Sequence, residues 1–316
     1  IQVCLWKMNI KHCTIFENAI QACMKTPQQS YPLLADAIGV SDVYLKREDL
    51  HQFGSHKGRS IPVMIKQSMK EGMRQFVISS SGNAALAAIL AIQAHNRNNT
   101  DHPLSLTVFV GKNIDEKKLA LLNNVIEDTQ VTISQVDRPK QMAFQQEKTG
   151  TAKFLRQSTD DTALIGYQEL ADELNNIPDL SAVFVPTSSG TTAQALGTEF
   201  ENQKDTIQIH IVQTTACHPI AQLFDIDGTN TETSLAGAIV DHIAHRKENV
   251  VRAVQTSKGS GWIITDAEIQ EAIALVEKTA NILLSPNSAL SVAGLIKAKK
   301  KGWSWTGPVA CLITGR

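Results

Sequence analysis

The sequence of 316 residues has little cysteine, almost no net charge and no long apolar run, and each shortage excludes a class of protein. Its five cysteines are odd in number and show no C-x-x-C spacing, which argues against a disulfide framework or a zinc site and favours a reducing, cytoplasmic compartment. No apolar stretch reaches the roughly 18 residues that a membrane-spanning helix needs, and the first residues show no secretory signal pattern. The balance of 30 basic against 31 acidic side chains indicates neither a nucleic-acid nor a membrane partner.

Three ligand-binding patterns are also missing. No G-x-G-x-x-G follows a strand-like run, so the dinucleotide fingerprint is absent. The hydroxyl-rich stretch at 187–192 contains no lysine, which distinguishes it from the nucleotide P-loop. The histidines at 242 and 245 have no third ligand nearby in the sequence, and we therefore expect no metal site.

What the sequence does contain is an alternation of short apolar runs with helical patterns. Strands are predicted at 43–45, 76–78, 106–110, 131–133, 182–185, 207–212 and 309–313. Several of these runs are almost wholly apolar, which is typical of strands covered on both faces. The alternation predicts an α/β fold with mainly parallel open sheets covered by helices. In such folds, ligands bind where strands end and helices begin.

Helical spacing is clearest in two places. Apolar residues recur from Ile61 to Met69, with Pro62 expected in the first turn. A capping box at Thr265–Glu268 precedes a second apolar stripe. The polar stretch 135–161 has no such stripe, and it is either a crossing between two lobes or a surface helix.

The first unusual turn lies in KREDLHQFGSHKGRS, residues 46–60. Gly54 permits a sharp turn and Ser55 can cap the helix that follows. Lys57 then falls in the first helical turn, where the helix dipole disfavours a positive charge. An uncharged amine is the form that Schiff-base chemistry requires. An ordinary solvated lysine explains this position equally well.

Three more strand ends carry small polar residues. Ser79, Ser80 and Ser81 precede Gly82-Asn83 at the start of a helix, where hydroxyl and amide groups can bind a carboxylate. In the stretch 187–192, small residues around Gly190 let backbone N–H groups converge on a phosphate. Thr314-Gly315 ends the last strand. Taken singly, these are helix caps or a chain end, but together with a reactive lysine they describe an amino acid joined to pyridoxal phosphate.

These motifs resemble those of the fold-type II pyridoxal-phosphate enzymes, the tryptophan synthase β-subunit superfamily, and most of all the threonine synthases. YLKREDLHQFGSHKGR resembles the lysine motif, SSSGNAAL the substrate loop and ACLITGR the terminal strand. VPTSSGTTAQALG stands where the family has its phosphate loop, and NILLSPNSALSVAGLIK resembles the helix before the last strand. The order and spacing agree from about Thr26 onward. The chain departs in having His56 where the family has Phe, Ser285 where threonine synthases have an acid, and SSGTT in the phosphate loop.

The resemblance implies a role for each motif. Lys57 would bind the cofactor as a Schiff base and then transfer protons, and Asn83 would hydrogen-bond the ring hydroxyl. Thr314 would contact the pyridine nitrogen through a neutral hydroxyl, which suits the cofactor to elimination and replacement. The substrate carboxylate would be faced by Ser79, Ser80 and Ser81. The cofactor phosphate would be held by Ser188, Ser189, Gly190, Thr191 and Thr192.

The resemblance also implies the organisation and the reaction. We expect a two-lobed homodimer, with a large cofactor-binding lobe at 1–65 and 150–316 and a small lobe at 66–149. The expected enzyme is a pyridoxal-phosphate-dependent lyase of amino-acid biosynthesis, like threonine synthase, which converts O-phosphohomoserine to threonine. A threonine or serine ammonia-lyase, and a cofactor-binding relative with weak or no catalysis, remain as alternatives.

Overall fold

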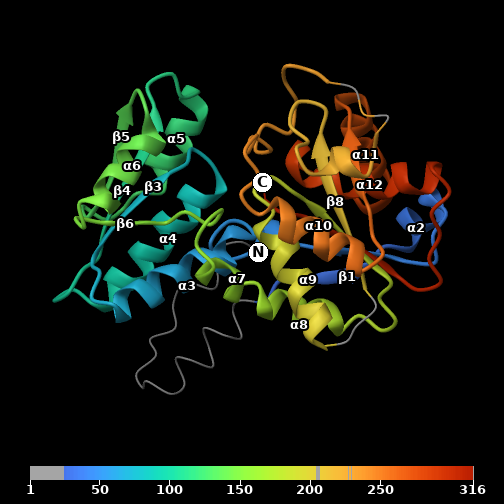
Figure 1. Cartoon of the computed structure of the whole chain (residues 1–316), viewed down its shortest axis with the longest axis horizontal. Helices are drawn as coiled ribbons and strands as arrows, with labels where there is room; N and C mark the ends of the chain where they lie inside the picture. Colours follow the sequence, from blue (N-terminus) through green and yellow to red (C-terminus); the bar gives the residue numbers. More distant parts are fainter. Residues whose placement is uncertain (1–24, 204–206, 227, 229, 316) are drawn as a thin grey trace.

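The computed structural model describes residues 25–203, 207–226, 228 and 230–315. Its strands form two separate sheets with helices around them, and the smaller sheet with its helices lies on the left of Figure 1. Of the five cysteines, those at 4, 13 and 23 lie outside the described residues, whereas Cys217 and Cys311 are buried free thiols. No helix in the described ranges is long and apolar enough to cross a membrane.

The larger sheet has six strands in the order β1-β2-β10-β7-β8-β9. They are β1 (Gln28–Ser30), β2 (Val43–Lys46), β7 (Ala182–Pro186), β8 (Gln208–Thr214), β9 (Gly261–Ile264) and β10 (Val309–Leu312). Every pairing between these strands is parallel except that of β1 with β2. Because β10 lies between β2 and β7, the end of the described chain forms the middle of this sheet.

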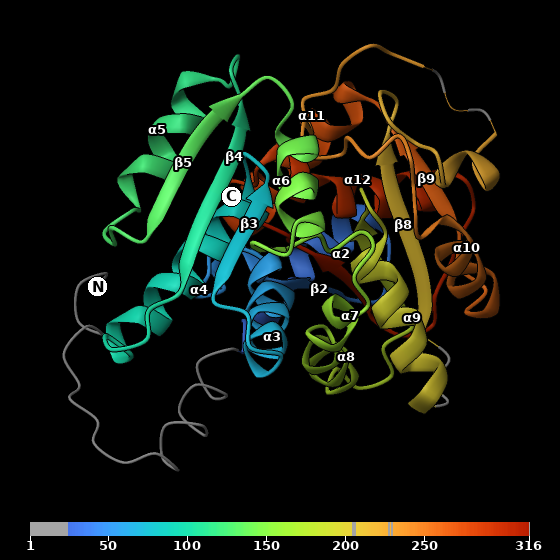
Figure 2. The same ribbon diagram turned by 60° about the vertical axis from the view of Figure 1, so that its left-hand side comes forward.

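The smaller sheet has four parallel strands in the order β5-β4-β3-β6. They are β3 (Gln75–Ser79), β4 (Ser105–Gly111), β5 (Val131–Val136) and β6 (Lys153–Phe154). Figure 2 brings these strands to the front, beside the larger sheet. Since the strands are parallel, their carboxyl ends share one edge of the sheet, and the turns that follow them can meet there.

Helices cover both faces of each sheet, because alternate strand residues point to opposite faces. One face of the larger sheet packs against α2 (Pro32–Ile38), α11 (Asp266–Ala280) and α12 (Pro286–Lys300). Its other face packs against α8 (Gln168–Asn175), α9 (Thr191–Gln203) and α10 (Lys247–Thr256). The smaller sheet is covered by α3 (Lys57–Lys70), α4 (Asn83–Asn98) and α5 (Glu116–Asn124) on one face and by α6 (Pro139–Lys148) on the other. Shorter pieces are η1 (Glu48–Leu50), α7 (Thr162–Ile165) and η2 (Ala221–Leu223).

The predicted fold class is confirmed, and all seven predicted strands are present. β1 and β6 escaped prediction because they have only three and two residues with little apolar content, and the four-residue β9 follows a glycine-rich turn. The predicted capping box at Thr265 forms at the start of α11. The polar stretch 135–161 contains α6 and β6 before the chain returns to the larger sheet.

The expectation for Pro62 was wrong. Because α3 begins at Lys57, Pro62 is the sixth helical residue and lies inside the helix rather than in its first turn. Nearby Ile61, Met64 and Ile65 pack in the apolar cluster of the smaller sheet. The lobe boundaries at 65/66 and 149/150 stay a prediction.

Candidate functional site

Lys57 is the first residue of α3, and the turn before it is closely packed. Gly54 has a φ of 81°, and a Cβ added there would lie 2.5 Å from Leu86 Cδ2 on α4. Ser55 is fully buried, and its hydroxyl accepts a hydrogen bond from the Lys57 backbone N–H at 3.3 Å. The Lys57 side chain is half-buried, and its amine has no ion-pair or hydrogen-bond partner among the described residues. The backbone is therefore fixed, while the amine is free to react.

The cations near Lys57 in the sequence are all paired. Arg59 is fully buried and contacts Glu48 at 2.7 Å and Glu173 at 2.6 Å. Lys46, also fully buried, pairs with Glu173 of α8. Desolvation acts to raise the pKa of Glu173, but the bonds from Arg59 and Lys46 outweigh it and the pKa is lowered overall. This buried network ties α3 to η1 and α8, and it anchors the helix that begins with Lys57.

Three of the four predicted turns meet at the end of the chain. A β-bridge joins Ser55 to Gly315. A Cβ added at Gly315 would lie 2.3 Å from Asn83 Nδ2 and 3.1 Å from Ser55 Cβ, so only glycine fits between these side chains. The Thr314 carbonyl accepts hydrogen bonds from the His56 backbone N–H at 3.0 Å and from His56 Nδ1 at 2.8 Å. The starts of α3 and α4 are therefore in contact with the end of the last strand.

His56 uses its ring to hold Thr314 in place. The ring stacks on Tyr167 with centroids 6.3 Å apart and an interplanar angle of 29°. Desolvation, with the adjacent Lys57 charge, lowers the pKa of His56 to about 3, so the ring is neutral at pH 7. Because Nδ1 faces a carbonyl oxygen, the single ring proton lies on Nδ1.

The serine turn follows β3 and leads into α4. Ser79, Ser80 and Ser81 are all partly exposed. The Ser80 hydroxyl accepts a hydrogen bond from the Gly82 backbone N–H at 3.3 Å. Within the described part of the chain, the hydroxyls of Ser79 and Ser81 make no hydrogen bond. These two side chains can therefore bind a substrate group at the N-terminus of α4.

The turn after β7 is buried and shaped around Gly190. Its φ is 88°, and an added Cβ would lie 2.6 Å from Val250 Cγ2. Both the backbone conformation and the lack of space therefore exclude a larger residue. The first intrahelical bond runs from the Gln194 N–H to the Gly190 carbonyl. In the described ranges, the backbone N–H groups of residues 189–192 have no hydrogen-bond partner. Four unbonded N–H groups at the N-terminus of α9 can bind an anion.

The hydroxyls of this turn are less available than the sequence suggested. Ser188 accepts hydrogen bonds from the backbone N–H groups of Val240 and Asp241 at 3.2 and 3.3 Å. Ser189 and Thr191 bond each other at 3.0 Å. Only the Thr192 hydroxyl makes no hydrogen bond among the described residues. An anion here would therefore be held mainly by backbone N–H groups.

Gln157 joins this turn to α3, and nothing in the sequence marked it as important. Its side-chain amide donates to the hydroxyl of Ser60, which lies three residues after Lys57 on α3. Its backbone carbonyl accepts from Thr191 Oγ1 at 3.2 Å and from Arg246 Nη2 at 2.9 Å. The start of α9 is therefore fixed relative to Lys57 through a single buried residue.

Two serines at the start of α12 hold Gly315. Ser285, the N-cap, and Ser288 donate to the Gly315 carbonyl at 2.8 and 2.6 Å. The Ser288 hydroxyl also accepts from the Gly315 N–H at 3.1 Å. The Ser285-Pro286 pair is typical of a helix start, but the sequence does not predict the contact of Ser285 with Gly315. The Thr314 hydroxyl makes no hydrogen bond to the described residues, and it is free to contact a ligand.

The chain is similar to several known proteins. Residues 20–315 match the model of the family described as pyridoxal-phosphate dependent enzyme. The chain is 28% identical to the threonine synthase of Mycobacterium leprae over 304 residues, which cover 92% of this chain and 80% of that protein. Among solved structures, maize serine racemase has a TM-score of 0.76 at 16% identity, covering 94% of this chain and 92% of that one. Threonine deaminase isoform 2 from Solanum lycopersicum has a TM-score of 0.74 at 18% identity, covering 98% and 86%.

The structural likenesses, at under 20% identity, show the fold, and the family match shows the cofactor class. The fold is the tryptophan synthase β-subunit type that the motifs predicted, and the predicted cofactor, pyridoxal phosphate, is confirmed. The chain is a member of the pyridoxal-phosphate dependent enzyme family.

Proposed function

We propose that this enzyme carries out elimination or replacement on an amino-acid substrate, with threonine-synthase-like conversion of O-phosphohomoserine to threonine as the first candidate reaction. The observation that carries the proposal is an unpaired lysine amine at position 57, two residues after Ser55, which meets Asn83 and Gly315. The 28% identity to a threonine synthase over most of the chain supports the choice of substrate.

The described residues fit pyridoxal phosphate. The unbonded N–H groups at 189–192, around a glycine that permits close approach, suit the dianionic phosphate. We assign the phosphate to Ser188, Ser189, Gly190, Thr191 and Thr192. Asn83 would donate to the ring hydroxyl, and the free hydroxyl of Thr314 would face the pyridine nitrogen.

In this assignment each side chain has one task. The cofactor, when bound, supplies an electron sink for the bond broken at the substrate α-carbon. Lys57 Nζ takes up the proton from that carbon and later returns one, which requires the neutral amine. Ser79 and Ser81 orient the substrate carboxylate at the N-terminus of α4. Thr314 presents a neutral hydroxyl rather than a charged acid, so it does not hold a proton on the ring nitrogen, and this favours reaction at the side-chain carbons.

The visible absorption spectrum with added pyridoxal phosphate tests the assignment of Lys57. We expect the wild-type chain to show the band of covalently bound cofactor and Lys57→Ala to lack it, with turnover reduced by at least about a thousandfold. Lys66→Ala is the matched control, because Lys66 is an exposed lysine of the same helix. If the wild-type and Lys57→Ala spectra were the same, the proposed role of Lys57 would be wrong.

A product assay then separates the candidate reactions. Threonine synthase chemistry releases phosphate and forms threonine, whereas an ammonia-lyase releases ammonia and a 2-oxo acid. The lyase is the second candidate because a threonine deaminase shares the fold at a TM-score of 0.74. A bound cofactor without turnover of either substrate would instead support a cofactor-binding relative with little catalysis.

A further inference from the structure

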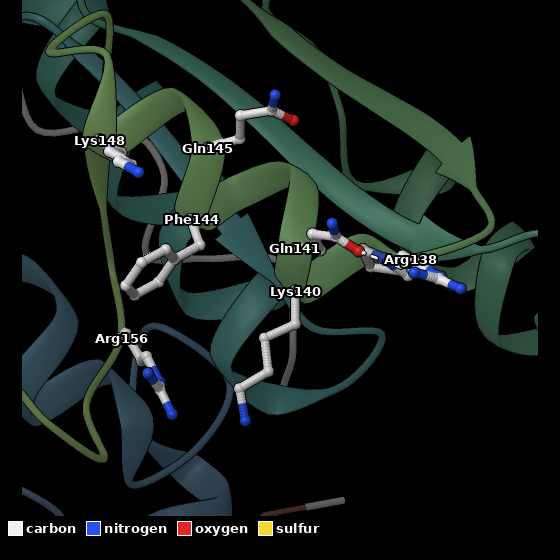
Figure 3. A pocket seen from close by; sticks show the side chains of 8 residues that line it. Arg138, Lys140, Gln141, Phe144, Gln145, Lys148 and Arg156 are labelled. Carbon is white, nitrogen blue, oxygen red and sulfur yellow. Dashed lines mark hydrogen bonds between the residues drawn. The ribbon is translucent and has the colours of Figure 1, made fainter.

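A cavity of about 570 Å³ lies against α6 (Figure 3). It is formed by this helix and by Arg156, which follows β6. We call it the α6 groove, and its lining residues are Arg138, Pro139, Lys140, Gln141, Phe144, Gln145, Lys148 and Arg156. None of the residues assigned above to cofactor or substrate lines it.

The charged side chains that line the α6 groove are all positive. Four of its eight lining residues are basic and none is acidic. Within the described part of the chain, none of these four forms an ion pair with a carboxylate. Other lysines of the same sheet do so, as in Lys112–Asp137 at 2.9 Å and Lys153–Asp160 at 3.1 Å. Like charges held in one groove repel each other, and a bound anion would relieve this repulsion.

Arg156 contributes a second, independent signal. Its Nε is buried and has no hydrogen-bond partner among the described residues. Its Nη2 lies 2.8 Å from Nε2 of His245, which precedes α10. This contact does not satisfy the Nε of Arg156, which still needs an acceptor. A bound anion would give the Arg156 guanidinium the acceptor that its Nε lacks, once the side chain turns toward the groove.

The α6 groove also has a flat apolar surface. Phe144 keeps 52% of its side chain exposed, which is unusual for an aromatic residue in the middle of a helix. Figure 3 shows its ring on the same side of α6 as the ends of Lys140 and Arg156. An aromatic face beside two cations suits a ligand that carries both a planar group and a phosphate.

We propose that the α6 groove binds a nucleoside phosphate, with the phosphate between Lys140 and Arg156 and the base against Phe144. The α6 groove has a direct structural link to the turn at 187–192. Arg156 immediately precedes Gln157, whose carbonyl accepts from Thr191. A ligand held by Arg156 therefore lies one residue from the contact that fixes the start of α9.

Calorimetric titration of the cofactor-loaded protein with AMP tests the proposal, with adenosine and inorganic phosphate as separate probes. We expect AMP to bind at least tenfold more tightly than either probe, because it uses both parts of the groove. Lys140→Ala/Arg156→Ala should weaken AMP binding by at least tenfold. The matched control is Lys117→Ala/Lys118→Ala, which removes the same charge from exposed positions on α5, on the opposite face of the sheet.

Phe144→Ala tests the aromatic part of the groove separately from the cationic part, because it changes no charge. It should weaken AMP binding and leave inorganic phosphate unaffected, and it keeps the test available should the double variant fail to fold. The cofactor absorption band serves as the folding check for every variant. Absence of AMP binding at millimolar concentration, or equal binding to the wild type and to the Lys140/Arg156 variant, would overturn the proposal. Inorganic phosphate that binds as tightly as AMP would also overturn it, by showing a simple anion site.

Discussion

His56 shows at the scale of one residue how a departure from the family can be accommodated. The ring stacks on Tyr167, as an aromatic side chain can, and it adds a hydrogen bond to the Thr314 carbonyl. The added bond comes with a pH dependence. A histidine with a pKa of about 3 stays neutral in the folded chain, whereas in the unfolded chain it takes up a proton near pH 6.5. The contribution of His56 to the stability of the fold is therefore complete above about pH 6.5, and it is lost as the pH falls toward 3.

Replacing His56 by Phe should remove this share of the pH dependence. Between pH 7 and pH 5, one such histidine lowers the free energy of unfolding by about 2 kcal/mol. We expect the wild type to lose more stability than that, because the pKa values of His51 and His210 are also lowered by burial, to about 4 and about 3. His56→Phe should lose about 2 kcal/mol less than the wild type over the same interval. Urea unfolding at the two pH values measures the difference.

The control for this comparison is Tyr167→Phe, which changes the stacked partner but leaves every histidine in place. Its stability should fall between pH 7 and pH 5 as much as that of the wild type. A His56→Phe variant with the wild-type pH dependence would show that folding does not lower the pKa of His56.

At the scale of elements, the site depends on how α12 holds the residues after β10. Ser288 is fully buried and makes two hydrogen bonds to Gly315, one through each backbone group. Ser288→Ala would leave the buried Gly315 N–H without a partner, which costs about 1–3 kcal/mol. It would also loosen Thr314, so we expect weaker cofactor binding. Chemical unfolding and titration with pyridoxal phosphate measure the two effects.

Ser291→Ala is the matched control, since Ser291 is an equally buried serine one turn further along α12. Its hydroxyl donates to the Ser288 carbonyl inside the helix at 3.0 Å and does not touch Gly315. We expect Ser291→Ala to leave cofactor affinity within about twofold of the wild type. Equal losses of affinity in both variants would mean that α12 acts only through general packing.

At the scale of the whole molecule, the proposed cofactor site draws together turns from both sheets and from both ends of the described chain. A ligand that binds only the folded state stabilises it, by about 2.7 kcal/mol at a hundredfold excess over Kd. We therefore expect pyridoxal phosphate to raise the unfolding midpoint by several degrees. Scanning calorimetry with and without the cofactor measures this shift.

Pyridoxal, which lacks the phosphate, is the control ligand for this experiment. It can still react with Lys57, but it leaves the N–H groups at 189–192 unbonded, so its stabilisation should be smaller by more than half. If pyridoxal stabilised the chain as much as pyridoxal phosphate, the turn at 187–192 would not be the phosphate site.

The sequence by itself determined the fold class, seven of the ten strands in the described residues, the turns and the cofactor. These features depend on local signals: apolar runs of strand length, glycine where the backbone turns sharply at Gly54 and Gly190, and small polar residues where helices begin. The family resemblance added roles for specific side chains such as Asn83, and these roles remain predictions.

Only the tertiary structure decided which of these residues touch. Gln157, Ser288 and Arg156 are chemically ordinary residues in the sequence, and each gains its importance from partners more than 20 residues away. The same holds for Glu173, which pairs with Arg59 114 residues earlier in the chain. Hydrogen bonds and ion pairs are short-range and directional, so contacts between distant segments exist only once the sheets have brought those segments together. That is the physical reason why the cofactor class could be predicted from the sequence, whereas the residues that hold the site together could not.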